Sequence, residues 1–108
     1  MAKQNRLDEL HELDIDYSIP INKFAQKVKA LVNRMAREMK VPVRSDYAEY
    51  CDGSAYVNLT VQPSINFLTK VEKEIRKLAR THKVNQEPLS LKIVDIQIGD
   101  YRIDVSFC

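Results

Sequence analysis

The chain has 108 residues, of which 44% are apolar and 30% charged, and its formal net charge is only +2. This length fits one compact domain that buries roughly 60–70% of its unfolded surface. The net charge alone predicts neither nucleic-acid nor membrane affinity, and no apolar run approaches the ~20 residues that a membrane-spanning helix needs. The first residues lack the apolar segment of a signal peptide, so we expect a cytoplasmic protein with no membrane partner.

Residues 1–12 are polar, and we expect them to precede a single domain over 13–108. From Leu13 onward, apolar and polar residues alternate with the period of a half-buried strand. This pattern predicts a first strand over 13–19, whose inward residues are Leu13, Ile15, Tyr17 and Ile19.

A first helix is predicted over 22–40, after Pro20. Asn22 can cap its first turn through the side-chain oxygen. The helix should end near Lys40, because Pro42 lacks an amide donor and favours extended geometry in the residue before it. Its apolar stripe is Phe24, Val28, Leu31, Val32, Met35 and Met39.

A hairpin and a second helix follow. Asp52-Gly53 is a strong turn signal, and an alternating strand follows it as far as Val61. Ser64 is then the predicted N-cap of a helix over 65–82, and residues 83–88 are predicted to form a loop. Two last strands are predicted over 89–98, with a bulge near Ile93-Val94, and over 101–107.

The predicted order β-α-β-β-α-β-β indicates an α+β fold. It is a two-layer sandwich of ferredoxin-like plan, β-α-β-β-α-β with an added C-terminal strand, in which two helices cover one face of an antiparallel sheet. If 13–19 is not a strand, the remainder is α-β-β repeated, still in two layers. The strand 101–107 is expected at one edge, where it can pair with a second copy in an oligomer.

An internal repeat supports this organisation. Moving the sequence back by 43 positions places Pro63 on Pro20 and the apolar stripe of the second helix on that of the first. The chain is therefore expected to contain two units, each with a strand, a proline and a helix.

Positive charge is concentrated on the two predicted helices, which hold twelve of the seventeen Lys and Arg residues on them or at their ends. Such a face is usually only solvated, but it can also bind phosphates through counterion release, or an acidic protein. A basic partner would instead meet an acidic face. The candidate basic residues are Lys27, Arg34, Arg37, Lys70, Lys73, Lys77 and Arg80, and the alternative acidic ones are Asp14, Asp16, Glu49, Asp52 and Asp104.

No catalytic motif, metal-ligand set or phosphate loop stands out, so we expect a non-enzymatic protein without cofactor or metal. Carboxylates on an exposed strand could hold a divalent ion, but they more often form a solvated surface. His11 and His82 have no sequence neighbours that would complete a zinc site with Cys51 or Cys108.

The segment 24–80 resembles the small accessory domains associated with large polyvalent proteins of plasmids and phages. The likeness rests on Val43-Arg44-Ser45, Gly53-Ser54, the strand 56–60 and Pro63 with the helix after it. It departs from the family pattern at Leu59, where a Trp is expected, and at Gln62, where a Gly is expected. The resemblance implies a mobile-element origin and an accessory role, and no site residue follows from it.

Together these observations predict a binding protein that docks on a protein or nucleoprotein partner. The most specific version of this hypothesis is inhibition of a host defence or nucleic-acid-handling complex. The alternative is a sequence-tolerant nucleic-acid-binding protein that uses the basic outer faces of its two helices.

Overall fold

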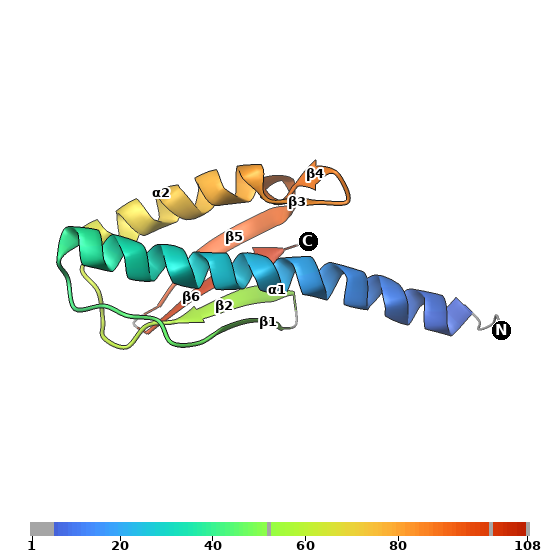
Figure 1. Ribbon diagram of the computed structural model, residues 1–108, viewed down its shortest axis with the longest axis horizontal. Coiled ribbons are helices and arrows are strands. Elements are labelled where there is room, and N and C mark those ends of the chain that lie inside the picture. The colour runs from blue at the N-terminus through green and yellow to red at the C-terminus, as the bar shows by residue number, and fades with distance from the viewer. Residues whose placement is uncertain (1–5, 52, 100, 108) are drawn as a thin grey trace.

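The computed structural model describes residues 6–51, 53–99 and 101–107 (Figure 1). Two long helices and a four-stranded sheet make up most of the fold, and a two-stranded sheet and a short 3₁₀ helix follow the second long helix. In chain order the elements are α1 (Arg6–Met39), β1 (Ala48–Cys51), β2 (Ser54–Asn58), α2 (Ile65–Thr81), β3 (Lys83–Val84), β4 (Glu87–Pro88), η1 (Leu89–Lys92), β5 (Ile93–Ile98) and β6 (Arg102–Phe107).

The four main strands form an antiparallel sheet in the order β1-β2-β6-β5. Both long helices pack on one face of this sheet, as Figure 1 shows. Alternate residues of the two central strands, such as Val57 and Ile103, are fully buried against the helices. The predicted α+β fold, with two layers and two helices on one face of the sheet, is therefore confirmed.

The predicted strand over 13–19 is wrong, because these residues belong to α1. No strand precedes α1 in the part of the chain that the structure describes, so the ferredoxin-like order loses its first strand. The main elements instead follow the order α-β-β-α-β-β, the expected alternative without that strand. The predicted boundary between residues 12 and 13 falls inside α1.

α1 has 34 residues, and a helix of that length measures about 51 Å. The longest dimension of the molecule is 55 Å, so α1 sets its length. The N-terminal part of α1, blue in Figure 1, extends beyond the end of the sheet.

The C-terminus of α1 is closed by a Schellman motif. Lys40 adopts the left-handed conformation with φ of 58°. Its amide donates to the Arg37 carbonyl (3.2 Å), and the Val41 amide donates to the Ala36 carbonyl (2.9 Å). The predicted end near Lys40 is thus confirmed, and Pro42 follows in a segment that is neither helix nor strand.

α2 begins where the sequence predicts. The Ser64 hydroxyl accepts a hydrogen bond from the Phe67 amide at 3.2 Å, as an N-cap does. The buried stripe of the helix then consists of Phe67, Val71, Ile75 and Ala79. The helix ends at Thr81, one residue before the predicted limit.

Three details after α2 differ from the prediction. The expected loop 83–88 contains the small β3–β4 hairpin, whose turn residues Asn85 and Gln86 both have positive φ. Residues 89–92 form η1 instead of the first part of a strand, while the predicted bulge lies between Ile93 and Asp95. β6 lies between β2 and β5, so the expectation that 101–107 is an edge strand is wrong.

The expected first unit of strand, proline and helix is wrong, because Pro20 lies inside α1 and no strand precedes this helix in the described part of the chain. What the two halves share is a long helix followed by two strands of the main sheet. The two helices run antiparallel in Figure 1, and the repeat pairs Phe24 with Phe67 and Val28 with Val71, all fully buried. β2 and β6 pair antiparallel about the Tyr56–Asp104 position. Because the helices lie side by side on the same face of the sheet, their outer surfaces form one continuous helical face.

Candidate anion-binding groove

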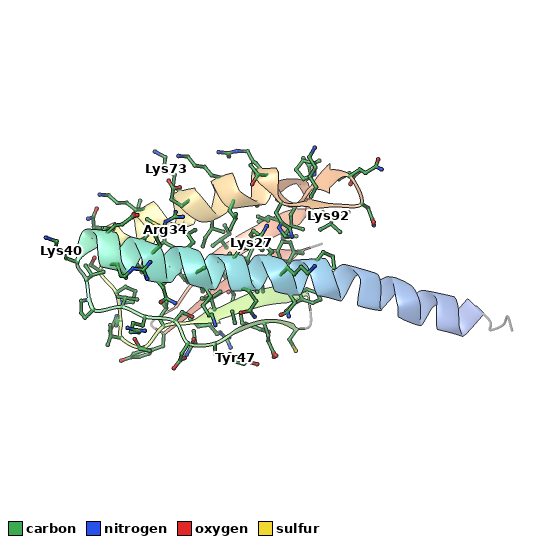
Figure 2. All side chains as sticks on the ribbon, in the orientation of Figure 1. Lys27, Arg34, Lys40, Tyr47, Lys73 and Lys92 are labelled. Atoms are coloured by element: carbon green, nitrogen blue, oxygen red, sulfur yellow. The ribbon has the colours of Figure 1, made fainter. Side chains whose placement is uncertain are left out.

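A groove of about 610 Å³ runs between α1 and α2 on the outer side of the helical layer. Four cations line it, three from α1 and one from α2, over apolar side chains that come from both helices. Figure 2 shows Lys27 and Arg34 on α1 along the side that faces α2. The complete lining is Lys27, Ala30, Leu31, Arg34, Arg37, Glu74, Lys77, Leu78 and Thr81.

A second hollow of about 440 Å³ lies beside the groove, toward the N-terminus of α2. Arg34 and Glu74 line both, so the two hollows adjoin, and Lys70 and Lys73 add two further cations. We call the two hollows together the basic groove. Six of the seven basic residues singled out in the sequence line it. Arg80 lines neither hollow, although it lies exposed on α2.

Acidic side chains neutralise part of this charge. Glu38 lies 3.8 Å from Arg34 and Glu74 lies 3.4 Å from Lys77, measured between the charged atoms. Both pairs are solvent-exposed, and exposed pairs of this kind contribute little to stability. Arg37 forms no ion pair with any residue that the structure describes, so its guanidinium is available to an external anion.

His82, the C-cap residue of α2, contacts Lys27, which lines the groove. Its Nε2 donates to the Pro20 carbonyl at 2.9 Å, and its Nδ1 accepts from the Lys27 ammonium at 3.3 Å. The ring also packs against Phe24, with 5.5 Å between centroids. Burial lowers the pKa of His82, the Pro20 hydrogen bond partly opposes this, and the charges of Lys27 and Lys23 lower the pKa further. The neutral imidazole therefore fits this site best.

The acidic residues proposed as an alternative face are not brought together in the same way. Asp14 and Asp16 lie in α1, not on the sheet, so the expectation that they share its open face is wrong. Asp52 lies outside the described residues. Glu49 and Asp104 both pair with Tyr56, from β1 and β6 respectively, on the sheet face away from the helices.

Asp104 is already engaged by its neighbours. Its Oδ1 lies 3.0 Å from Nε of Arg102, an ion pair without hydrogen-bond geometry. The Arg102 guanidinium in turn lies 4.7 Å from the centroid of the Tyr56 ring. The open sheet face therefore offers neither a free carboxylate pair nor an uncovered aromatic platform at this position.

A polar network that sequence reasoning missed holds the segment between α1 and β1. The Asn58 side-chain oxygen accepts from the Ser45 hydroxyl and from the amides of Asp46 and Tyr47, at 2.8–3.2 Å. Asn33 of α1 exchanges two hydrogen bonds with the Ser45 backbone. These contacts position the segment rather than form a site, because their polar groups satisfy one another.

Asn22 also has a role different from the predicted one. It lies within α1, and its side-chain oxygen accepts from the Tyr50 amide of β1 at 3.1 Å instead of capping a helix. The sequence shows a residue able to accept a backbone hydrogen bond, but α1 starts earlier and the acceptor serves the sheet.

Within the described part of the chain, no three His, Cys, Asp or Glu residues lie close enough together to hold a metal ion. No helix there is both long and apolar enough to cross a membrane. The chain matches no family model, no curated protein and no solved structure. The resemblance to plasmid and phage accessory domains, and the inhibitory role inferred from it, stay predictions.

Proposed function

We propose that this chain is a non-enzymatic binding module whose helical face contacts the phosphate backbone of nucleic acid. One observation carries the proposal: the antiparallel packing of α1 and α2 brings six cations from two distant segments into the basic groove, against two carboxylates. A protein that neutralises several phosphates gains affinity by releasing the counterions condensed on them.

The lining of the groove favours contact with the backbone over reading of bases. Its apolar residues are Ala30, Leu31, Leu78 and Met35, with no aromatic ring among them. Successive bases of single strands usually stack on aromatic side chains, and bases of duplexes are read by a helix inserted in the major groove. Here the groove lies between the parts of α1 and α2 that pack side by side on the sheet, so its lining does not belong to a projecting helix. Binding is therefore expected to tolerate changes of sequence.

Some exposed cations on the two helices have a carboxylate partner three or four residues away, as Arg76 has in Glu72 at 3.2 Å. Arg37 lines the groove without such a partner, and it is exposed. A phosphate that binds Arg37 displaces no internal ion pair.

The test is equilibrium binding to labelled duplex and single-stranded DNA and RNA, titrated from low to physiological salt. We expect the logarithm of the binding constant to fall linearly with the logarithm of the salt concentration. Arg37→Gln should weaken binding to all sequences alike and reduce the salt slope by about 1. Arg80→Gln is the matched control, because it removes the same charge from an exposed helical site outside the groove.

Two outcomes would count against the proposal. Equal losses in Arg37→Gln and Arg80→Gln would show a diffuse effect of net charge rather than a groove. Binding that disappears before physiological salt would leave a protein partner as the better explanation of the basic face.

A further inference from the structure

The two edges of the main sheet differ, and this difference is independent of the basic groove. At the β1 edge, side chains of α1 bind the outward backbone groups. The Tyr50 amide donates to Asn22 at 3.1 Å, and Gln26 donates to the Ala48 carbonyl. This edge is therefore partly closed by the chain itself.

The β5 edge has no such cover. The Gly99 amide donates to the Arg102 carbonyl at 2.8 Å. Because hydrogen-bonded and non-hydrogen-bonded residue pairs alternate along an antiparallel ladder, this bond shows which residues of β5 bind β6. Asp95 and Gln97 therefore direct their backbone groups toward β6, while Ile96 and Ile98 direct theirs outward. No hydrogen bond from another described segment reaches these outward groups. An edge of this kind is a template for one more strand.

Exposed apolar side chains flank the open edge. Val94, at the bulge in β5, is 65% exposed, Leu91 of the preceding η1 is 73% exposed, and Tyr101, just after β5, is 58% exposed. Large apolar side chains with this exposure are frequent at interaction sites when they gather around one structural feature. The described chain leaves more than half of each of these residues uncovered.

We propose that β5 pairs with β5 of a second copy, antiparallel and centred on Gln97. The two four-stranded sheets would then join into one continuous sheet of eight strands. In this register Ile96 lies opposite Ile98 of the second copy, and both residues present outward backbone groups. The two symmetry-related Ile96–Ile98 pairs form four inter-copy backbone hydrogen bonds.

The side chains in this register are also compatible with one another. On the helix-covered face, the partly or fully buried Ile96 and Ile98 meet their counterparts. On the open face, Gln97 meets Gln97 of the second copy, and amides can donate to one another. Asp95 lies opposite Gly99, so no two carboxylates face each other across the interface. The backbone hydrogen bonds of the pairing use only Ile96 and Ile98, which lie beyond the bulge.

The same register explains the exposed apolar residues at the ends of β5. It brings Val94 of one copy near the turn that carries Tyr101 of the other, once at each end of the interface. A second copy thus covers apolar surface as well as satisfying the backbone. A peptide added to the edge would gain the backbone hydrogen bonds without this reciprocal contact.

The experiment is sedimentation equilibrium of the full chain over a wide concentration range, for the wild type and for Gln97→Lys and Gln97→Glu. Gln97 is exposed, so both variants should keep the fold, which circular dichroism and thermal unfolding would check. The wild type should form dimers. Each variant places two like charges face to face, and its dimer dissociation constant should rise about tenfold. An equimolar mixture of the two should recover dimers, because Lys then faces Glu.

Gln86→Lys is the control, since it adds the same charge in the β3–β4 turn, and it should leave the dimer unchanged. Amide exchange supplies a second measurement: the Ile96 and Ile98 amides should become protected as concentration rises. A wild-type protein that stays monomeric at high concentration would overturn the proposal. So would a dimer that neither Gln97 variant weakens, because β5 would then not be its interface.

Discussion

His82, at the C-terminal end of α2, forms hydrogen bonds with both Pro20 and Lys27 of α1. The Pro20 carbonyl can only accept, so Nε2 must carry the proton of the neutral ring, and Nδ1 keeps a lone pair for the Lys27 ammonium. Protonation would place a second N–H against that ammonium and add a charge beside Lys23 and Lys27. The contact between α1 and α2 is therefore built for neutral histidine.

The first prediction concerns the pH dependence of stability. The pKa of His82 is lowered in the folded protein, by burial first and by Lys27 and Lys23 as well, relative to about 6.5 in an unfolded chain. Between the two pKa values the unfolded state binds more protons, so the free energy of unfolding rises with pH there. This stabilisation is complete above pH ~6.5 and is lost as pH falls toward the folded pKa.

Urea unfolding of the wild type and of His82→Gln, from pH 7.5 down to 5, would measure this effect. The difference in unfolding free energy between the two proteins isolates His82, because the carboxylates contribute equally to both. We expect the wild type to lose more stability than the variant as pH falls through 6. Parallel curves would show that His82 has the same pKa folded and unfolded.

For single residues, the sequence predicts the hydrogen bonds that form between near neighbours in the chain. The Ser64 cap was predictable because its partner, the Phe67 amide, lies three residues away. Asn58 gives no comparable signal, since its partners Ser45, Asp46 and Tyr47 lie 11 to 13 residues earlier and approach only once the segment after α1 has folded onto β2. For the same reason, the contact of His82 with Pro20, 62 residues earlier, could not be foreseen.

At the scale of elements, α1 shows how one segment can satisfy two patterns. Residues 13–19 alternate as a strand does, but Leu13, Tyr17 and Phe24 also recur at helical spacing. Pro20 favoured the first interpretation, because proline lacks the donor that an interior helical position uses. In the structure the helix continues through Pro20, and the later turns, packed on the sheet, support it.

The second prediction follows from that proline. Pro20→Ala restores an amide that can donate to the carbonyl of residue 16. The substitution also keeps the backbone carbonyl of residue 20, which accepts the hydrogen bond from His82. We expect the free energy of unfolding to rise by about 1–2 kcal/mol, the gain in the helix being partly offset by greater freedom of the unfolded chain. Chemical denaturation would measure it.

Pro42→Ala is the comparison, because Pro42 lies after α1 in a segment that is neither helix nor strand. It should not gain stability, and a small loss is expected. If Pro20→Ala instead destabilised the protein, the helix would have to break at residue 20, as the strand interpretation of 13–19 requires.

At the scale of the whole molecule, the order of the predicted elements predicted two layers correctly, and the apolar stripes of the two helices placed the basic residues on the outer side of the helical layer. Both follow from amphipathic helices, whose polar faces must point away from the sheet that their apolar stripes cover. The order of the strands in the sheet could not be predicted from these patterns. Placing β6 between β2 and β5 depends on pairing of Tyr56 with Asp104, which are 48 positions apart, and local patterns carry no information about such pairs.

The last prediction concerns how that shared basic side responds to a polyanion. The cations of the basic groove repel one another across the two helices, and a ligand that binds only the folded state stabilises it by mass action. Tripolyphosphate at ten times its dissociation constant should add about 1.4 kcal/mol, which corresponds to a rise in Tm of about 6 °C for a domain of this size.

Sodium chloride at the same ionic strength should produce a smaller rise, because screening alone lacks the contacts of a bound anion. Arg37→Gln should reduce the shift caused by tripolyphosphate, whereas Arg80→Gln should retain it, since Arg80 lies outside both hollows. If both salts shifted Tm equally, the helical face would act as a uniform charged surface. The groove between α1 and α2 would then not be an anion site.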